Sequence, residues 1–281
     1  MGKQLIVCSD MEGASGIFEK DRKQIWHGTE EWRNCGRDKI TSDVLAVCLA
    51  ANEFGINDIL IYDGHYAGDP EPNIIAERLP KNVRFFDTEN RCFDWRRIRG
   101  QADLKPWGII TVGQHSRFGE KNAYFPHTIQ TPPIKAFWCN KLHVAEIGTA
   151  VLSFQPVPYL ANIGCQASMA EARELNPHVV AISVKDKARG WEPSHEETFP
   201  LIQAGVLEAL RNRERMTLLS MTEPCRFALE LTDGYSFVPP PEYPWKGRFE
   251  QTSASWEAPY VEMGLELFNC VRSLIKKEEA P

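Results

Sequence analysis

Long apolar runs are absent from this sequence of 281 residues. The first apolar run, residues 5–8, is too short for the core of a signal peptide, and no run approaches the about 20 residues that cross a bilayer. Hydrophobic residues make up 43% of the chain and charged residues 25%, as in an ordinary globular protein. We therefore expect a cytoplasmic protein with no membrane partner.

Paired cysteine motifs are also missing. The 8 cysteines are scattered along the chain and form no CxxC pair. Without an export signal they are expected to be free thiols in a reducing compartment. This pattern argues against a zinc site built from thiolates.

The sequence has no excess of basic charge. The 32 Lys and Arg residues are outnumbered by 38 Asp and Glu residues, and the net charge is -6. The one basic cluster, Arg96-Arg97-Ile98-Arg99, is short. A nucleic-acid binder normally presents a basic face, so we expect no nucleic-acid partner. Fixed-period repeats and low-complexity tracts are absent too, which excludes solenoids and disordered scaffolds.

Short apolar runs alternate with helical patterns over the first two thirds of the chain. The predicted strands are residues 5–9, 58–62, 83–86, 108–112, 158–163 and 179–184. The predicted helices are residues 41–54, 74–79, 169–175 and 196–213. Continuous apolar strands separated by helices predict an α/β fold, with a doubly wound, mostly parallel sheet and helices on both of its faces.

Two parts of the chain depart from this alternation. Residues 134–139 and 142–145 flank Asn140-Lys141, which predicts a tight hairpin. Beyond about residue 215, a strand at 226–231, a proline-rich stretch at 237–244 and a helix at 257–277 predict a smaller α+β portion. The predicted division is therefore an α/β domain at 1–214 and a smaller C-terminal portion at 215–281.

Acids and histidines follow three of the predicted strands. The first strand ends in Asp10 and Glu12, the next in Asp63-Gly64-His65, and the strand at 108–112 is followed by His115. Doubly wound sheets carry their sites just beyond the carboxyl ends of their strands. Two carboxylates at i and i+2 project to one side of an extended segment, so both can reach one ion. Imidazole and carboxylate ligands suit zinc.

Glu146 adds a further acid within an otherwise apolar segment, His143–Ile147 in the order HVAEI. Burying this acid is unfavourable unless it pairs or binds a metal. Each residue taken alone has an ordinary structural alternative, since an acid after a strand can cap a helix or bind a ribose. A histidine at a strand end is often only a hydrogen-bonded structural residue. The joint occurrence at successive strand ends favours a metal site without excluding these alternatives.

The run SDMEGASG, beginning at Ser9, resembles the opening motif of the D-aminopeptidase family known as the M55 metallopeptidases. Further blocks of that family are matched in the same order by DGH ending at His65, GQH ending at His115, PHT around His127 and AEIG around Glu146. The match extends from the first strand to about Lys185. The resemblance implies a zinc-dependent hydrolase with two ions in each subunit.

The resemblance also assigns roles to individual residues. It implies that Asp10 bridges both ions, that Glu12 and His65 complete the first site, and that His115 and Glu146 complete the second. The catalytic histidine of the family falls on His127. The implied reaction is cleavage of an amide bond in small peptides by an aminopeptidase with a preference for D-residues. Metal-activated water would attack, with His127 as acid/base or as nucleophile.

Three further residues are weaker candidates. Asp63 could orient the imidazole of His65, or simply form the turn before Gly64. Lys185 and Arg189 match basic positions of the family and could bind a substrate carboxylate or an oxyanion, or be ordinary solvated residues. The chain departs from the family at Gly164-Cys165-Gln166, where members commonly carry a Gly-Asp-Asp-like turn. This departure puts the substrate in doubt more than the chemistry.

Other functions remain as alternatives. One is an amidohydrolase acting on a non-peptide amide or lactam. Another is a Rossmann-like nucleotide-binding module, which is disfavoured because no GxGxxG follows the first strand and acids there would repel a pyrophosphate. A protein that interacts with partners but binds no metal is disfavoured because all five ligand positions are intact. The resemblance finally implies self-association into a ring-like homo-oligomer, with a homodecamer as the expected form.

Overall fold

The computed structural model describes residues 3–68, 71–86, 104–129, 132–243 and 245–279. The basic cluster at 96–99 lies outside these residues. All cysteines of the described part are free thiols, as expected, namely Cys8, Cys35, Cys48, Cys139, Cys165, Cys225 and Cys270. None of the helices in these ranges has the length and apolar character needed to cross a bilayer.

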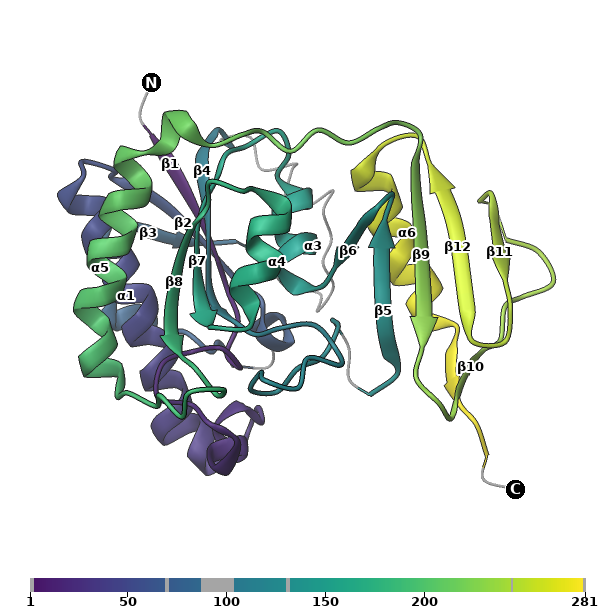
Figure 1. Cartoon of the computed structure of the whole chain (residues 1–281), viewed down its shortest axis with the longest axis horizontal. Coiled ribbons are helices and arrows are strands. Elements are labelled where there is room, and N and C mark those ends of the chain that lie inside the picture. The colour runs from purple at the N-terminus through teal and green to yellow at the C-terminus, as the bar shows by residue number, and fades with distance from the viewer. Residues whose placement is uncertain (1–2, 69–70, 87–103, 130–131, 244, 280–281) are drawn as a thin grey trace.

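A parallel sheet forms the larger part of the molecule (Figure 1). Within the described residues it has six strands in the order β3-β2-β1-β4-β7-β8, and every neighbouring pair is parallel. The strands are β1 (Gln4–Ser9), β2 (Asp58–Asp63), β3 (Val83–Phe85), β4 (Pro106–Gln114), β7 (Tyr159–Cys165) and β8 (Val180–Lys185). The predicted parallel sheet is thus confirmed. Its central strand β1 is buried along its whole length, which explains its continuous apolar sequence.

Helices cover both faces of this sheet, as predicted. Helices α1 (Arg37–Glu53) and α5 (His195–Arg211) pack against each other on one face. Helices α3 (Glu146–Ser153) and α4 (Ser168–Leu175) lie on the other. The start of α5 is fixed by a capping box, in which Ser194 and Glu197 each accept a hydrogen bond from the other's backbone N–H.

Short helical turns lie in the connections between the strands and helices. They are η1 (Glu19–Ile25), the π-helical η2 (Trp32–Gly36), η3 (His65–Gly68), η4 (Ala76–Arg78) and η5 (Arg213–Arg215). The predicted helix at 74–79 is therefore wrong in extent, because only the single turn η4 forms there. Tertiary contacts take the backbone N–H groups before it, since Asp63 accepts from Ile74 and Thr41 accepts from Ile75.

A second, antiparallel sheet lies at the other end of the molecule. Its order in the described part is β11-β12-β9-β5-β6. The strands are β5 (Ile134–Cys139), β6 (Leu142–Val144), β9 (Cys225–Leu231), β11 (Gly247–Phe249) and β12 (Ser253–Ala258). The predicted hairpin is confirmed, because β5 and β6 pair across Asn140-Lys141, with Asn140 at φ 54. In this sheet β5 and β6 come before residue 214 in the chain, whereas β9, β11 and β12 come after it.

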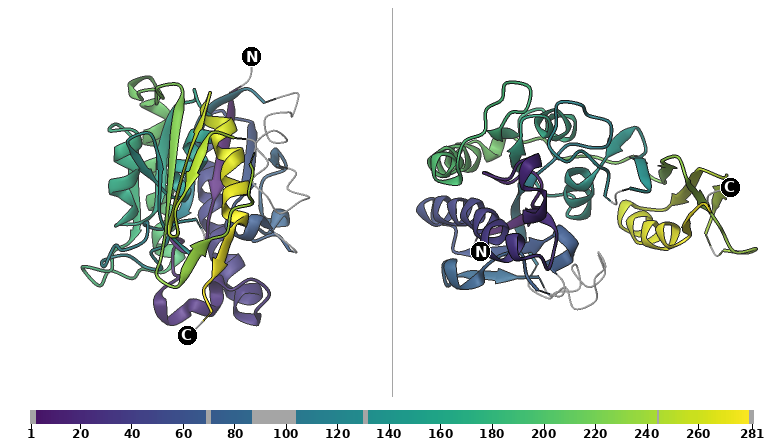
Figure 2. Two further views of the ribbon diagram at one scale, coloured as in Figure 1. Left: turned by 90° about the vertical axis from the view of Figure 1, so that its right-hand side faces the viewer. Right: turned by 90° about the horizontal axis from the view of Figure 1, so that it is seen from below.

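The C-terminal segment differs from the single predicted helix at 257–277. The chain instead forms the end of β12, then α6 (Val261–Ser273), then the strand β13 (Ile275–Lys277), which pairs with β10 (Tyr235–Phe237). The predicted helix began too early, because residues 257 and 258 belong to β12. Burial alternates along this strand, with Ala254, Trp256 and Ala258 buried on one face. Seen from below, α6 lies between α3 and the C-terminal strands (Figure 2).

Two hydrophobic cores lie on the two faces of the parallel sheet. Alternate residues of β1 enter different cores: Leu5 and Val7 face α1 and α5, whereas Ile6 and Cys8 face the opposite side. The second core continues without a break into the antiparallel sheet, where it includes Phe137. The antiparallel sheet therefore shares its core with the parallel sheet.

Candidate metal centre

The loop after β1 crosses the end of β4 in close backbone contact. Asp10 N–H donates to the carbonyl of Val112 at 2.8 Å, and Gly13 N–H donates to that of Gly113 at 2.8 Å. A Cβ atom on Gly13 would lie 1.8 Å from the carbonyl oxygen of Gln114, so only glycine fits this crossing. The crossing brings the acids of the first strand end next to the histidine that follows β4.

His65 lies two residues after the end of β2, beside the same acids. The N–H of Gly64 donates to the carbonyl of Ser9 at 2.9 Å, which joins the ends of β1 and β2. The Nδ1 atom of His65 lies 3.3 Å from Oδ1 of Asp10 and 3.1 Å from Oε2 of Glu12. The structure thus brings together the residues of the first two strand ends.

His127 and Glu146 complete the cluster from two other segments. The rings of His115 and His127 stack with centroids 3.9 Å apart. The Nε2 atom of His115 lies 3.3 Å from Oδ2 of Asp10 and 3.6 Å from Oε1 of Glu146. The Nε2 atom of His127 lies 3.5 Å from the same Glu146 oxygen and 4.0 Å from Oε1 of Glu12. Glu146 is the first residue of α3, where the helix dipole favours a carboxylate.

The three histidines share one hydrogen-bonding pattern. One ring nitrogen of each bonds to a main-chain carbonyl, and the other ring nitrogen faces the acids. The carbonyl contacts are His65 Nε2 to Ile25 (2.7 Å), His115 Nδ1 to Ser116 (2.8 Å) and His127 Nδ1 to Phe125 (2.9 Å). A carbonyl accepts only, so each of these nitrogens carries a proton, and the inward nitrogen is the one that could bind a metal after losing any proton of its own.

Several buried atoms of the cluster lack a hydrogen-bond partner within the described residues. They are Oδ2 of Asp10, Oε2 of Glu12, Nε2 of His115 and Oε2 of Glu146. Buried polar atoms without partners are rare, and a bound ion is one of the ordinary ways in which such atoms are satisfied. Ligand atoms of Asp10, Glu12 and His115 lie within 4.8 Å of one another, and so do those of His115, His127 and Glu146. The residues therefore fit a carboxylate-imidazole metal site.

Burial and the neighbouring charges shift the pKa values of the cluster in opposite directions, and the charges together have the larger effect. Burial by itself raises the pKa of Asp10, but His115 and His65 outweigh it and hold the pKa well below its usual range. Burial by itself lowers the pKa of His65, but Glu12 and Asp10 raise it well above its usual value. The pKa of His115 is raised in the same way by Glu146 and Asp10. Such a cluster attracts positive charge, whether protons or a metal cation.

The cluster opens toward one side. The His115 side chain is 0% exposed, whereas that of His127 is 13% and that of Glu146 is 22% exposed. A substrate would thus approach over His127 and Glu146.

Asp63 holds the loop around His65. Its carboxylate accepts from the backbone N–H of Asn73 at 2.7 Å and from the Asn73 amide at 2.8 Å. The Asn73 amide also donates to the carbonyl of His65 at 2.6 Å, and Trp32 Nε1 donates to the Asn73 side chain at 2.9 Å. The contacts of Asp63 thus reach the backbone of His65 through Asn73. Asn73 had not been singled out in the sequence.

Lys185 lies beneath the loop that carries the first acids. Its Nζ atom donates to the carbonyl oxygens of Glu12, Ala14 and Ile17. Burial lowers the pKa of this lysine to about 8. Its ammonium group therefore faces main-chain carbonyls rather than the open side of the cluster.

Glu171 is a buried acid that the sequence reasoning did not single out. It accepts from Ser116 Oγ at 2.8 Å and from the backbone N–H of Arg117 at 2.7 Å, and so anchors the segment after His115 to α4. Burial raises the pKa of its carboxyl group. The sequence does contain a pattern that places Glu171 on the buried face of α4. The buried residues follow the helical spacing i, i+3, i+4, i+7 at Ser168, Glu171, Ala172 and Leu175. An acid on that face needs a buried partner.

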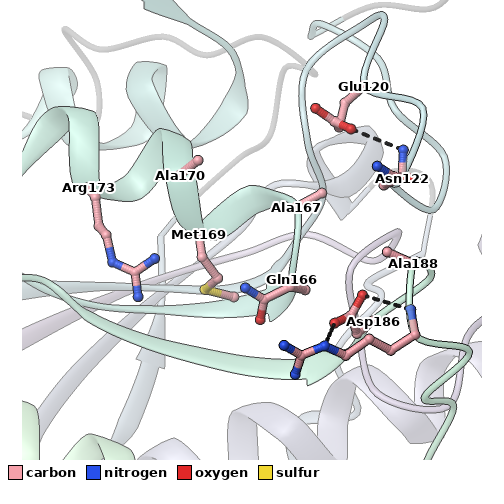
Figure 3. Close-up of a pocket in the computed structure, with 10 residues that line it drawn as sticks. Glu120, Asn122, Gln166, Ala167, Met169, Ala170, Arg173, Asp186 and Ala188 are labelled. Carbon is pink, nitrogen blue, oxygen red and sulfur yellow. Dashed lines mark hydrogen bonds and ion pairs between the residues drawn. The ribbon is translucent and has the colours of Figure 1, made fainter.

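Gly164-Cys165-Gln166, the turn that departs from the family pattern, borders a pocket of about 340 Å³ (Figure 3). Gln166, Arg173 and Arg189 line it, together with residues of the segment around Glu120. The exposed Arg189 pairs with Asp186 at 3.5 Å. As far as the described residues go, the pocket shares no lining residue with the acid–histidine cluster.

Comparison with known proteins places the chain in a family and agrees with the fold. The chain belongs to the M55 peptidase family, whose D-aminopeptidase model matches residues 4–268. The predicted family resemblance is thus confirmed.

The chain is also similar to individual proteins. The D-aminopeptidase of Bacillus subtilis (strain 168) is 24% identical over 243 residues, which make up 86% of this chain and 79% of that protein. The solved structure of the Zn-dependent D-aminopeptidase DppA from Bacillus subtilis, a self-compartmentalizing protease, matches with a TM-score of 0.79. That match covers 96% of this chain and 97% of the other at 19% identity, and it supports the fold.

Proposed function

We propose that this protein is a zinc-dependent hydrolase that cleaves an amide bond in small peptides, as an aminopeptidase with a preference for D-residues. The observation that carries the proposal is the convergence of buried carboxylate and imidazole atoms from the ends of β1 and β4 and from the start of α3, which have no hydrogen-bond partner within the described residues. Membership of the M55 family supports the peptidase activity, and the names of the two Bacillus subtilis relatives support zinc and D-residues.

We further propose two zinc ions per subunit, with Asp10 as the bridging ligand. Glu12 and His65 would complete one site, and His115 and Glu146 the other. The two oxygens of Asp10 support this assignment, because Oδ1 lies 3.3 Å from His65 Nδ1 and Oδ2 lies 3.3 Å from His115 Nε2. One carboxylate thereby faces both histidines, as a bridge requires.

His127 is the proposed acid/base. Bound zinc supplies Lewis acidity, which polarises a carbonyl and makes water more acidic. His127 directs Nε2 toward the cluster, since its Nδ1 proton is held by the carbonyl of Phe125. Nε2 therefore accepts a proton from the attacking water and returns it to the leaving amine. The alternative, His127 as nucleophile, predicts a covalent acyl-imidazole that mass spectrometry of rapidly quenched enzyme would detect.

The test of the proposed function combines metal analysis with matched histidine variants. Purified protein should contain zinc, and Asp10→Ala should lose both the metal and the activity. His127→Ala should retain zinc yet lose most turnover, whereas the exposed His178→Ala should change neither. Protein that takes up no zinc would contradict the proposal, and loss of metal in His127→Ala would make that residue a ligand.

A different hydrolase activity is an alternative, because one turn of this chain departs from the family pattern in a way that could change the substrate. Gly164-Cys165-Gln166 replaces the acidic turn common in the family, and Gln166 lines the pocket beside it. An amidohydrolase acting on a non-peptide amide or lactam would fit the same metal chemistry. A screen of zinc-loaded enzyme with D- and L-aminoacyl peptides, simple amides and lactams separates the two, since turnover confined to lactams would exclude the aminopeptidase.

We also propose that the chain self-associates in the cytoplasm as a ring-like homo-oligomer, with ten subunits as the expected number. The support is its similarity to DppA, a self-compartmentalizing protease. Light scattering tests this directly. A mass equal to the single 32.0 kDa chain would contradict it.

A further inference from the structure

Lys185 is a buried lysine that the proposed reaction does not use. It is the last residue of β8, and its exposed fraction is 0%. Its Nζ atom donates to the carbonyl oxygens of Glu12 at 2.7 Å, Ala14 at 2.9 Å and Ile17 at 2.5 Å. An ammonium group has three N–H bonds, and these contacts use all of them. Lys185 thus has no N–H left for a substrate carboxylate or an oxyanion.

The surroundings of this ammonium resemble a site for a small monovalent cation. Three carbonyl oxygens converge on it, and the rings of Tyr124 and Phe18 lie 5.1 and 5.8 Å from Nζ. Asp43 attracts the same charge and accepts a hydrogen bond from the backbone N–H of Ser15 at 2.9 Å. Lys185 and Asp43 therefore bind the carbonyls and an amide of one loop.

That loop begins at a proposed zinc ligand. Lys185 holds the main-chain carbonyl of Glu12, whose carboxylate lies 3.1 Å from His65. The next residue, Gly13, donates its N–H to the carbonyl of Gly113 at the end of β4. The backbone at Glu12 is therefore fixed from β8 and from β4, on two sides of the loop.

We propose that Lys185 is a positioning residue for the metal centre, whose tethered ammonium fills the carbonyl cage of residues 12–17 and so fixes the backbone of Glu12. The proposal rests on the proposed zinc site. It replaces the sequence-based expectation that Lys185 binds substrate.

Truncation and chemical rescue test this role. Lys185→Ala leaves the cage without its cation, and we expect zinc affinity, measured by competition with a chelator, to fall about 10- to 100-fold. Added ammonium chloride should recover much of the loss, because the free ion can enter the cage. Tetramethylammonium chloride at the same ionic strength should not, because this cation has no N–H. Lys185→Met should lose zinc affinity without rescue, since its side chain fills the cage.

Lys187→Ala is the matched control. Lys187 lies two residues further along, and its Nζ binds Glu19 at 2.7 Å and the carbonyl of Ala123 at 3.1 Å. Its removal deletes a lysine of the same region without emptying the cage. We expect zinc affinity close to that of the wild type, with no response to ammonium.

Hydrogen exchange in zinc-free protein gives a readout independent of the metal. The backbone N–H groups of residues 13–17 should exchange faster in Lys185→Ala than in the wild type, and ammonium should slow them. Wild-type protein that binds no zinc would overturn the proposed function, while the exchange measurement still tests Lys185. Unchanged zinc affinity and unchanged exchange in a folded Lys185→Ala would overturn its role. If that variant does not fold, unchanged zinc affinity in Lys185→Met would do so.

Discussion

Gly13 lies where the loop after β1 crosses the end of β4, and a side chain there has no room. In Gly13→Ala the Cβ atom would stand 1.8 Å from the carbonyl oxygen of Gln114 and 2.2 Å from its carbonyl carbon. Real Cβ atoms essentially never approach closer than 3.0 Å, so the two backbones must separate by about the difference, 1.2 Å. The obstacle is main chain, which cannot rotate away as a side chain would.

This separation acts on both sides of the proposed metal centre. Asp10 and Glu12 belong to one backbone, and His115 follows the other. Zinc–ligand distances tolerate deviations of only about 0.2 Å, so a shift of this size disrupts the ligand set. We expect Gly13→Ala to weaken zinc binding by about 100-fold or more, equivalent to about 2.7 kcal/mol. Competition with a chromogenic chelator measures the affinity, and circular dichroism checks that the variant is folded.

Gly16→Ala is the control within the same loop. Its φ of +70° adds backbone strain, but the nearest heavy atom to its Cβ would be a side-chain carbon of Lys39 at 3.4 Å. We expect its zinc affinity to stay within about threefold of the wild type, since no main chain must move. A folded Gly13→Ala with equally unchanged zinc affinity would refute the reasoning.

Three further predictions concern pH and stability. Burial lowers the pKa of His65 and His115, yet the neighbouring acids raise both well above the usual value, so both hold protons in zinc-free protein near neutral pH. Zinc must displace these protons, so zinc affinity should fall as the pH falls; a calorimetric binding enthalpy that does not depend on the buffer would contradict this. Trp32→Phe removes the buried N–H that donates to Asn73 at 2.9 Å, and urea unfolding should show a loss of about 1–3 kcal/mol. An unchanged midpoint and slope would show that the bond contributes nothing. Phe268→Ala empties a buried site between α6 and the antiparallel sheet, and we expect a loss of about 3–5 kcal/mol of unfolding free energy. Zinc affinity should not change, because this residue lies outside the cluster.

The residues of the cluster could be selected from the sequence because parallel strands end at one edge of a sheet. Asp10, Glu12, His65 and His115 each follow an apolar strand, and the structure brings them together at the ends of β1, β2 and β4. Glu146 could be selected because an acid in an apolar segment needs a partner. Their roles as zinc ligands stay a prediction, as do the catalytic role of His127 and the division of the chain near residue 215.

Contacts between distant segments could not be predicted in the same way. The first two thirds of the chain indicated where strands and helices form, since those patterns are local. The short turn η4 in place of a helix depends on Asp63 and Thr41, and the start of the predicted C-terminal helix belongs to β12 because it pairs with β9.

By itself, the sequence of this protein determined the alternating α/β architecture, the family motifs and the acids and histidines at the strand ends. Only the tertiary structure decided that His127 stacks on His115 and that Glu171 anchors the segment after β4. It also decided that the ammonium of Lys185 faces main-chain carbonyls about 170 residues earlier in the chain. The physical reason is that a residue type gives its chemistry, whereas burial and the partners brought by folding determine what that chemistry acts on.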